Sequence, residues 1–502
     1  MNNQIYQLLM DYYHLDKKDL LEIINLDDNI KNSQAPAIIN ACRRIEQAQI
    51  NHQRILVVGD YDADGITSTA ILMRLFSHLG IQANFYIPKR ETEGYGLNIK
   101  LVELAYDHHF DLLVTVDNGV KALEAIARAK ELNMEMMIID HHEYEDLPEV
   151  ASFVHSKIIE DDFQHFSAAG LALLMANYFY NDDYNIVLAA IGLTGDLMSI
   201  DHHIRKIVRK ANKLIKINDY PSIKHLLTKG FNDDSIAFEI VPKLNALSRT
   251  GLGNVNNLVK YLNSDNDDEI LRLATDIDSI NNYRKKITSE YFTKIMNEGI
   301  DDQAIIVFES EDFKEGLCGL IASLLVKEYR RPAIIFARSG EVLKGSGRSF
   351  KEFDLYQYLK GLKIFESFGG HAKAVGLSIK PENISLLKRY IADNPVPITV
   401  STDEYIDIDA DDLTVELVEF IDKLRPFGKD FEEPIFRINN LEIKSRFMIK
   451  NRYPKWTLKN GIEAISFEKI HQIDHITSFI GQLKFNNFKT QKKISVTVKN
   501  VL

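Results

Sequence analysis

The stretch of residues 54–69 constrains the fold more than any other part of the chain, because it joins a buried strand directly to a row of acids. Residues 55–58 read Ile-Leu-Val-Val, an apolar run typical of a strand that is buried on both faces of a parallel sheet. Carboxylates follow at every second position, at Asp60, Asp62 and Asp64. Gly65 then predicts a turn, and the apolar spacing over residues 67–79 predicts a helix.

An acidic row at this point of a sheet favours a bound cation. In open α/β sheets, ligands lie in the crevice beyond the carboxyl ends of the strands. Three carboxylates gathered there repel one another unless a cation or bound protons compensate their charge. A solvated acidic turn is the alternative. The pattern Asp-x-Asp-x-Asp-Gly directly after a buried strand favours the metal site.

Two later strands end in polar clusters of the same kind. Residues 111–116 form an apolar run followed by Asp117-Asn118-Gly119, and residues 134–139 form one followed by Asp140-His141-His142. Helical patterns lie between the strands, so the alternation predicts a doubly wound parallel sheet of the α/β class. Since the carboxyl ends of parallel strands meet at one edge, we expect the three clusters to converge on a metal centre.

The residue types in these clusters indicate which metal binds and how many ions there are. Carboxylates with one or two imidazoles suit manganese or magnesium better than zinc in a thiolate cage. The acids suffice for two cations, and a pair about 3.5–4 Å apart would clamp the attacking and leaving oxygens of a phosphoester displacement. Downstream, an apolar helical run over residues 185–200 breaks at Gly195-Asp196. Asp196 is there either an ordinary helix cap or a further ligand on the far side of the site.

Composition narrows the class of protein and its compartment. The 502 residues predict about two to four domains. Cys42 and Cys318 are the only cysteines, which excludes a disulfide framework and a thiolate zinc site. No apolar run is long enough to cross a membrane, and the start, Met-Asn-Asn-Gln, lacks a signal-peptide pattern. We therefore expect a cytoplasmic protein with no membrane partner.

The C-terminal part of the chain differs in charge from the rest. The net charge is −12 overall, whereas residues 437–502 hold 13 Lys and Arg against 4 Asp and Glu. A basic module on an acidic body predicts binding to a polyanion. Short strand-like runs over the last about 100 residues predict a small β-barrel, and aromatic residues alternate there with the cations, as single-strand binding requires. Some of these aromatics form the barrel core, and Tyr453 and Trp456, in a polar run, are the predicted exposed ones.

Three further segments complete the predicted organisation. Residues 1–50 are helical and mostly polar, and they predict a cap ahead of the first strand. Residues 267–298 contain no Gly or Pro and predict one long connecting helix. A second, smaller α/β unit follows it. Within that unit, Gly345-Ser346-Gly347-Arg348 and Gly369-Gly370-His371 predict Gly-rich turns that present N–H groups and cations to phosphates.

With these motifs the chain resembles the DHH phosphoesterase superfamily and, within it, the RecJ single-strand-specific exonucleases. The motifs that carry the likeness are residues 60–65, Asp117-Asn118-Gly119, Asp140-His141-His142, Gly195-Asp196, residues 242–249, residues 345–349 and residues 368–372. The resemblance implies a DHH catalytic domain over residues 51–262, a connecting helix over residues 263–299, a DHHA1-type substrate-binding domain over residues 300–395 and an OB-fold over residues 400–502.

The resemblance also implies roles for single residues. Two Mn²⁺ or Mg²⁺ ions would be held by Asp62, Asp64, Asp117, His141 and Asp196, with Asp117 and Asp196 as bridges. Asp60 and His142 would orient these ligands or contact the scissile phosphate. Phosphates of the nucleic acid would be bound by Arg249, Ser346, Arg348, Gly369, Gly370 and His371.

By resemblance the chain is a metal-dependent phosphodiesterase, a 5′→3′ exonuclease on single-stranded DNA that acts in DNA repair and recombination. A helicase and a single-strand-binding protein are the partners that such an activity suggests. Two rivals stay open, a DHH enzyme for short oligonucleotides or small nucleotides and a non-catalytic DNA-binding scaffold. The basic, aromatic C-terminal module argues against the first rival, and the complete set of acids and histidines argues against the second.

Overall fold

The structure, a computed structural model, describes residues 3–90, 92–94, 96–300, 302–395, 404–450, 453–467, 476–486 and 493–502. The chain forms two compact units. The larger unit contains Asn32–Asp196 and Ile215–Ser401, and the smaller unit contains Met1–Lys31, Leu197–Leu214 and Thr402–Leu502. The prediction of one N-terminal cap over residues 1–50 is therefore wrong, because its first part groups with the C-terminal part of the chain. The boundary predicted at residues 395–400 falls on residues 396–403, which lie outside the described residues.

The first sheet of the larger unit has five parallel strands in the order β2-β1-β3-β4-β5. These strands are β1 (Ile55–Val58), β2 (Ala83–Tyr86), β3 (Leu112–Val116), β4 (Glu135–Asp140) and β5 (Ser152–His155). Every residue of β1 and β3 is buried, as their continuous apolar pattern predicts. The strand order reverses between β1 and β3, and ligands of doubly wound sheets bind at such a switch point.

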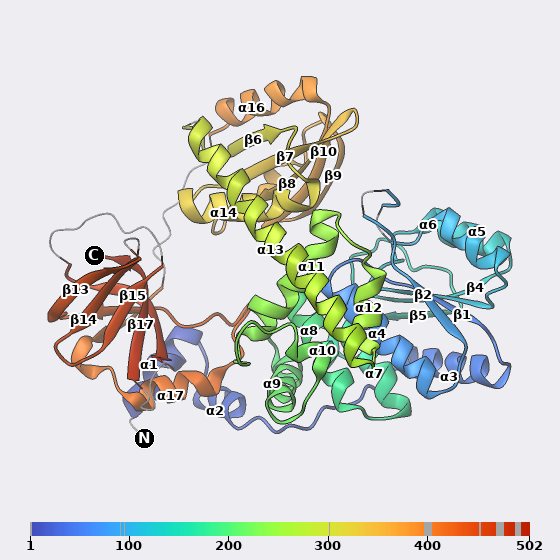
Figure 1. Cartoon of the computed structure of the whole chain (residues 1–502), viewed down its shortest axis with the longest axis horizontal. Helices are drawn as coiled ribbons and strands as arrows, with labels where there is room; N and C mark the ends of the chain where they lie inside the picture. The colour runs from blue at the N-terminus through green and yellow to red at the C-terminus, as the bar shows by residue number, and fades with distance from the viewer. Residues whose placement is uncertain are drawn as a thin grey trace. The chain divides into compact units, whose positions relative to one another are not determined.

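Helices cover both faces of this sheet (Figure 1). They are α3 (Pro36–Ile50), α4 (Ala63–His78), α5 (Ile99–Asp107), α6 (Leu123–Glu131), α7 (Ala168–Phe179) and α8 (Asp183–Gly195). On one face, Leu56, Leu113 and Ile138 share a core with apolar residues of α5 and α6. On the other face, α3, α4 and α7 contact β5, β3 and β4, and α8 packs on α4 and α7. The predicted doubly wound α/β domain is confirmed.

Further helices lead from this domain to the next. They are α10 (Pro221–Lys224), the π-helix η3 (Ile236–Ile240), α11 (Val241–Thr250), α12 (Asn256–Asn263) and α13 (Asp267–Glu298). The helix before them, α9 (His202–Ile217), belongs mostly to the smaller unit. The bounds of α13 are those predicted for the long connecting helix. The Asn266 side chain begins it by accepting a hydrogen bond from the N–H of Glu269. α13 contacts α10, α11 and α12 on one side of the connection and α14 on the other.

The second α/β domain is built on a mixed sheet in the order β6-β7-β8-β10-β9. Its elements are β6 (Ile306–Ser310), the 3₁₀ turn η4 (Glu315–Leu317), α14 (Cys318–Tyr329), β7 (Ala333–Ser339), β8 (Val342–Arg348), α15 (Leu355–Leu359), β9 (Phe365–His371), β10 (Ala374–Ile379) and α16 (Ile384–Asp393). The predicted Gly-rich turns are wrong, because both motifs lie in β8 and β9, the strands that flank β10. Close packing explains two of these glycines: a Cβ would lie 2.5 Å from the Phe336 ring at Gly345 and 2.7 Å from Val375 at Gly347.

The smaller unit has a seven-stranded mixed sheet in the order β11-β12-β16-β17-β15-β14-β13. These strands are β11 (Ile406–Asp409), β12 (Phe436–Asn439), β13 (Ile443–Ile449), β14 (Tyr453–Leu458), β15 (Glu463–Ser466), β16 (Phe479–Asn486) and β17 (Lys493–Val501). β12 pairs with β16, whereas β13 pairs with β14 at the far end of the order. Only residues 440–442 separate β12, the second strand of the order, from β13, the last one. This short connection brings the two sides of the sheet together, and the sheet curls into the predicted OB-like barrel.

Three helices pack on this barrel: α1 (Asn3–Tyr13), α2 (Lys17–Ile24) and α17 (Val415–Leu424) (Figure 1). Leu9 and Leu20 are fully buried in the same core as Trp456. The predicted exposure of Trp456 is wrong, because its side chain is fully buried. Successive residues of a strand point to opposite faces, and in β14 the buried set is Pro454, Trp456 and Leu458.

Candidate metal centre

The acidic row that follows β1 forms the start of α4. Asp62 caps this helix, since its Oδ1 accepts hydrogen bonds from the N–H groups of Asp64 (2.9 Å) and Gly65 (3.1 Å). The helix therefore begins at Ala63, earlier than predicted, and Gly65 lies in its first turn instead of forming a separate one. A Cβ on Gly65 would lie 2.5–2.7 Å from backbone atoms of Asp60. Glycine thus lets the strand end touch the helix start, which gathers the three acids at one point.

Asp64 is buried and held by a second helix. Its carboxylate accepts hydrogen bonds from the Ser167 hydroxyl (2.6 Å) and from the N–H groups of Ala168 (2.9 Å) and Ala169 (3.1 Å), at the N-terminus of α7. Burial and the charge of Asp62 nevertheless raise the pKa of Asp64 to about 6. The helix end orients this carboxylate without removing the electrostatic need for a cation.

The second motif follows β3 in a conformation that side chains rarely adopt. Asp117 has a φ of +63°, and non-glycine residues with such φ values often occur at functional sites. Asn118 anchors the turn, because its Nδ2 donates to the carbonyls of Val58 (3.0 Å) and Val116 (2.9 Å) and its Oδ1 accepts from the N–H of Leu97 (3.0 Å). This side chain ties the ends of β1 and β3 together and sets the position of Asp117.

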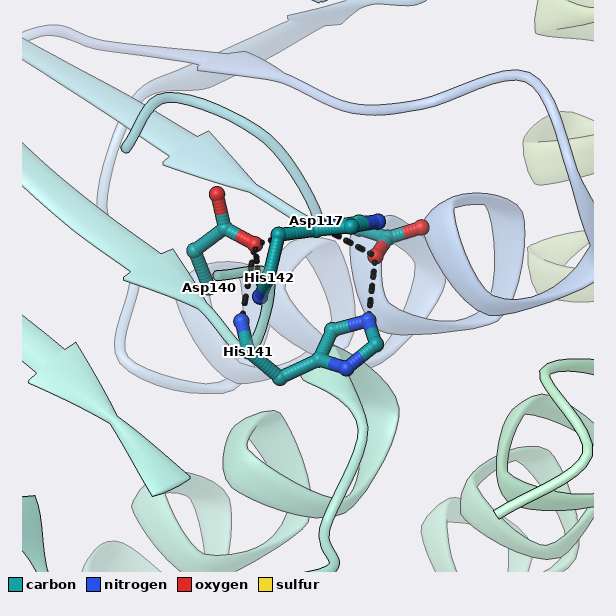
Figure 2. Close-up of side chains that lie close together, drawn as sticks. All are labelled: Asp117, Asp140, His141 and His142. Carbon is teal, nitrogen blue, oxygen red and sulfur yellow. Dashed lines mark hydrogen bonds and ion pairs between the residues drawn. The ribbon is translucent and has the colours of Figure 1, made fainter. Parts of the chain in front are cut away.

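The third motif follows β4, and its first residue orients the other two (Figure 2). Asp140 Oδ1 accepts hydrogen bonds from the N–H groups of His141 (2.7 Å) and His142 (3.1 Å) and from His142 Nδ1 (2.8 Å). Asp140 Oδ2 accepts from the N–H of Val120 (3.1 Å). His155 supports the same loop: its Nδ1 accepts from Lys157, so its Nε2 donates to the carbonyl of His142 (2.9 Å).

The predicted ligands from the three strand ends and from α8 converge on His141. Its Nε2 lies 3.2 Å from a carboxylate oxygen of Asp117, 3.5 Å from one of Asp196 and 3.9 Å from one of Asp64. Asp196 is the residue at the C-terminal end of α8, so it lies at the helix end and beside the ligand cluster, in agreement with both interpretations of the sequence. The structure brings Asp64, Asp117, His141 and Asp196 to one place.

Asp117 lies between two groups of ligand atoms. One group joins it to Asp140, His141 and His142, and the other joins it to Asp60 and Asp62. Within each group, one ligand atom per residue lies within 4.8 Å of all the others. Two neighbouring groups that share a carboxylate are the arrangement that two-metal sites use.

The charges in the site favour cations over protons alone. Burial raises the pKa of the Asp60 and Asp117 carboxyls well above the usual range. The charge of Asp62 adds to this effect at Asp60, and the charge of Asp64 adds to it at Asp117. Burial, and then the charge of His142, lower the pKa of His141 to about 3, which keeps its ring neutral as a metal ligand must be. Among the described residues, Asp60 Oδ1 is a buried oxygen without a hydrogen-bond partner. Oxygen donors with one neutral imidazole therefore fit manganese or magnesium.

His142 differs from its neighbour in charge. Burial works to lower its pKa, but the hydrogen bond and the charge of Asp140 raise it to about 9. For Asp140, burial works to raise the pKa, and the hydrogen bond from His142 and its charge lower it to about 2. The two residues thus form an ion pair at neutral pH, beside the carboxylates that are to bind metal.

The second domain contributes the predicted phosphate-binding residues. Alternate residues of β8 share a face, which places Ser346 and Arg348 together with Lys344. Arg348 Nη1 donates to the Ser346 hydroxyl (3.2 Å) and to the carbonyl of Gly347 (2.9 Å). A Cβ on Gly319, in the first turn of α14, would lie 2.8 Å from Arg348 Nη2 and 3.2 Å from Ser346 Oγ. Helix N-termini attract anions, so this hydroxyl and guanidinium lie at a point suited to phosphate.

The other predicted binding residues lie on β9 and α11. Gly369, Gly370 and His371 are exposed at the end of β9, and a Cβ on Gly369 would meet no atom within 4 Å. The charge of His371 helps, after Lys157, to lower the pKa of Glu143, which follows the third motif directly. Arg249 lies at the end of α11, and the charge of Asp62 is among those that act on its pKa. Arg249 and His371 therefore both lie near the metal centre.

In the OB-like barrel, Tyr453 is half-buried and its ring meets Phe467 edge-on, with centroids 5.7 Å apart. Its contact with nucleic acid stays a prediction. The residues that the sequence analysis left out of the site are supporting ones, Asn118, Asp140, His155 and Ser167. Asn118 and Asp140 stand within the motifs, whereas Ser167 and His155 carry no sequence signal because only the fold brings them there.

Three family models match the chain, in the predicted order. The DHH family N-terminal domain matches residues 54–195, the DHHA1 domain matches residues 301–393 and the RecJ OB domain matches residues 406–500. The candidate metal centre lies in the segment that matches the DHH domain, the β8–β9 residues lie in the segment that matches the DHHA1 domain and the barrel lies in the segment that matches the RecJ OB domain.

Individual relatives extend this likeness over nearly the whole chain. The single-stranded-DNA-specific exonuclease RecJ of Bacillus subtilis (strain 168) is 30% identical over 498 residues, which cover 92% of this chain and 62% of the relative. The chain thus spans less than two thirds of the length of that relative. Among solved structures, RecJ in complex with Mn²⁺ from Thermus thermophilus matches with a TM-score of 0.84 at 22% identity, over 99% of this chain and 75% of that one, and shares its fold.

A second solved structure, of exonuclease RecJ bound to manganese, matches with a TM-score of 0.63 at 25% identity, over 73% of this chain and 97% of that one. Among the residues that the structure of this chain describes, no helix combines the length and the apolar character that crossing a membrane requires.

Proposed function

We propose that the chain hydrolyses single-stranded DNA from its 5′ end and uses two divalent cations to do so. The observation that carries the proposal is the position of Asp117, a carboxylate shared by two groups of ligand atoms and 3.2 Å from His141. The B. subtilis relative, a single-stranded-DNA-specific exonuclease that is 30% identical, supports the substrate and the reaction. When bound, such a pair of cations would supply an activated water for attack on phosphorus and would stabilise the leaving oxygen.

In this proposal, two Mn²⁺ or Mg²⁺ ions would be held by Asp62, Asp64, Asp117, His141 and Asp196, and Asp117 and Asp196 would serve both ions. Neutral His141 offers a lone pair, and Ser167 fixes the Asp64 carboxylate through its hydroxyl. Asp60, buried behind the row, orients the ligand set. The protein residues supply position and negative charge, since metal ligands work only when their partners hold them in place.

His142 acts on the substrate in this proposal. The ion pair with Asp140 keeps its ring protonated at neutral pH, and the hydrogen bond at Nδ1 directs Nε2 toward the scissile phosphate. A charged N–H stabilises negative charge that grows on phosphate oxygens during attack. His142 therefore contributes binding and charge stabilisation without holding a metal.

The DNA strand is held by cations and open backbone in this proposal. Arg249, Ser346, Arg348 and His371 bind phosphates, and Gly369-Gly370 lets the strand approach β9 closely. Tyr453 on the outward side of β14 contacts bases in the OB domain. Trp456, a core residue, has no direct contact with the strand.

Digestion of a long single strand, labelled at one end or the other, in the presence of Mn²⁺ tests the proposal. The wild-type chain should release a 5′ label at once and a 3′ label late, and it should leave duplex DNA intact. Asp117→Asn should lower the rate by about 100-fold or more. Even substitution of a residue that only hydrogen-bonds to a metal ligand lowers activity or metal affinity by about 10–100-fold. Asp107→Asn, at the exposed end of α5, is the matched control and should keep full activity.

Two outcomes would replace the proposal. Fast cleavage of a dinucleotide with an untouched long strand would assign the chain to small nucleotide substrates. Absence of any cleavage, with tight binding of single strands, would assign it to a DNA-binding scaffold. Action on DNA agrees with the predicted cytoplasmic location, and the helicase and single-strand-binding partners stay predictions.

A further inference from the structure

Four arginines gather beside the metal centre in the larger unit: Arg90, Arg249, Arg284 and Arg348. Burial, and then the like charges of Arg284, Arg90 and Arg348, lower the pKa of Arg249 to about 10, whereas the charge of Asp62 acts in the opposite direction. Arg90 also lies over the ring of Tyr61, 5.4 Å from its centroid, and Tyr61 stands between two acids of the first motif. Through Arg249 and Arg90 the cluster therefore borders the first motif.

Very few carboxylates balance these cations. Among the described residues, no carboxylate oxygen lies within 4.0 Å of the guanidinium of Arg249 or of Arg348. Burying several guanidinium groups side by side is unfavourable, because their like charges repel. An anion that binds among them compensates this repulsion. The cluster thus has the charge of a site for a phosphate.

One carboxylate, that of Glu315, reaches into this cluster. Its Oε1 lies 3.8 Å from Arg90 Nη2 and its Oε2 lies 3.2 Å from Lys344 Nζ. Lys344 shares a face of β8 with Ser346 and Arg348. Glu315 therefore spans from the DHH domain to the row of β8 side chains that is suited to phosphate.

The backbone holds Glu315 in this position. It begins the η4 turn, and the next residue, Gly316, lies directly against α11: a Cβ there would be 2.4–2.9 Å from backbone atoms of Arg249. Only glycine permits this approach, so the turn that carries Glu315 is fixed to the helix that carries Arg249.

We propose that Glu315 is a built-in competitor of the terminal phosphate, an intramolecular anion that occupies Arg90 and Lys344 until a nucleotide 5′-phosphate displaces it. The proposal deepens the proposed exonuclease function and rests on it. Hydrolysis from the 5′ end leaves each product as a nucleotide whose phosphate lies in this cluster. A competing carboxylate weakens the binding of that product and speeds its release.

Charge explains why the effect falls on terminal phosphates. A phosphomonoester carries about −1.5 to −2 at neutral pH, and its three oxygens suit the forked donors of arginine. A strand that ends in a 5′-hydroxyl brings at most a singly charged phosphodiester to the cluster, so Glu315 affects its binding less. Both ion pairs of Glu315 are partly exposed, with 29% of its side chain accessible, and such pairs add little to folding stability.

Calorimetric titration of the full chain with thymidine 5′-monophosphate in EDTA, where no turnover occurs, tests this proposal. Glu315→Gln, which keeps the shape and removes the charge, should bind the nucleotide more tightly than wild type, by up to about fivefold. Glu311→Gln, an exposed neighbour before the same turn, is the matched control and should bind as wild type does. Thymidine, which lacks the phosphate, should bind all three chains equally.

A second readout separates this proposal from the exonuclease assignment. In steady-state digestion of a 5′-phosphorylated strand, Glu315→Gln should lower KM and lower kcat together, as expected when product release limits turnover. A chain that digests DNA as proposed, but whose Glu315→Gln variant binds the nucleotide equally or more weakly, would overturn the role of Glu315 alone. Glu315→Asp, which keeps a charge but shortens the reach, should also tighten nucleotide binding, and a loss of binding would contradict the proposal.

Discussion

Asp64 is a buried carboxyl group that three hydrogen-bond donors hold before any cation binds. Ser167, Ala168 and Ala169 all donate to it, yet burial and the charge of Asp62 still raise its pKa to about 6. A proton and a divalent cation therefore compete for the same oxygens near neutral pH. Burial likewise raises the pKa of Asp60 and of Asp117.

The first prediction is that stabilisation by Mn²⁺ grows as pH rises through about 6. A carboxyl whose pKa is raised on folding stabilises the metal-free fold below its unfolded pKa and loses that contribution as pH rises through the folded pKa. For Asp64 this amounts to about 3 kcal/mol lost between about pH 4 and pH 6. Mn²⁺ binds the deprotonated site, so the rise in Tm with saturating Mn²⁺ should be larger at about pH 7.5 than at about pH 5.

Asp64→Asn provides the control for that measurement. It removes the titrating group, so the metal-free chain should lose less stability between about pH 4 and pH 6 than wild type does. An equal Mn²⁺-dependent rise in Tm at both pH values would contradict the prediction.

At this scale, the sequence predicts which residues come together where each follows a recognisable buried strand. Asp64, Asp117 and His141 follow three such strands, and the structure brings them to one place. Their role as metal ligands stays a prediction. Ser167 could not be found in this way, because its place beside Asp64 depends on how α7 packs against α4. Trp456 was misjudged because its polar sequence neighbours point to the opposite face of β14.

At the scale of single elements, the junction between β1 and α4 is a close contact that shapes the site. The Asp62 cap starts the helix earlier than its apolar spacing predicts, since that spacing records burial and contains no information on a cap. Gly65 is needed because the helix start touches the backbone of Asp60. A similar limitation applies to the motif in β8, where Gly345 and Gly347 mark close packing and not a turn.

The second prediction is that Gly65→Ala disturbs the site without adding or removing any charged group. The new Cβ must push Asp60 or the first turn of α4 away, which should lower stability by about 1–3 kcal/mol and weaken Mn²⁺ binding. Chemical denaturation and calorimetric titration with Mn²⁺ measure the two effects. Gly361→Ala is the control, because a Cβ there meets no atom within 4 Å; equal behaviour of the two variants would rule out the close contact.

The third prediction separates the two faces of β14. Trp456→Ala removes a buried ring that lies 5.0 Å from the Phe479 ring between centroids, and it should cost about 3–5 kcal/mol of stability. Tyr453→Ala, on the outward face, should leave stability within about 1 kcal/mol and weaken binding of single-stranded DNA. Unfolding curves and fluorescence anisotropy compare the variants, and the reverse pattern would restore Trp456 as a base-stacking residue.

At the scale of the whole molecule, each unit is assembled from separate stretches of chain. The smaller unit takes Met1–Lys31, Leu197–Leu214 and Thr402–Leu502, and its core includes Leu9 and Leu20 from the first stretch. The α/β domains were predictable because their strands and helices alternate locally. The grouping of α1 and α2 with the barrel was not predictable, since the residues in contact are about 400 positions apart and no local pattern records such a distance.

The fourth prediction is that Leu20→Ala destabilises the smaller unit and leaves the metal centre unchanged. Leu20 is fully buried, and removing such a side chain typically costs about 2–5 kcal/mol. Differential scanning calorimetry should show an earlier transition that does not respond to Mn²⁺, with unaltered Mn²⁺ affinity. Leu104→Ala, at a side chain that is 45% exposed, should change little; a loss of Mn²⁺ affinity in Leu20→Ala would assign α2 to the larger unit.

The path of the chain through the smaller unit affects how the protein is made. The hydroxyl of Tyr13 donates to the carbonyl of Glu432, 419 residues later in the chain. At a translation rate of about 5–20 residues per second, α1 leaves the ribosome roughly 20–80 s before that carbonyl exists. During this interval the nascent chain exposes Leu9 and Leu20 to chaperones and to neighbouring nascent chains. Yield in the cell therefore depends on protection of the first helices during synthesis as well as on the stability of the finished fold.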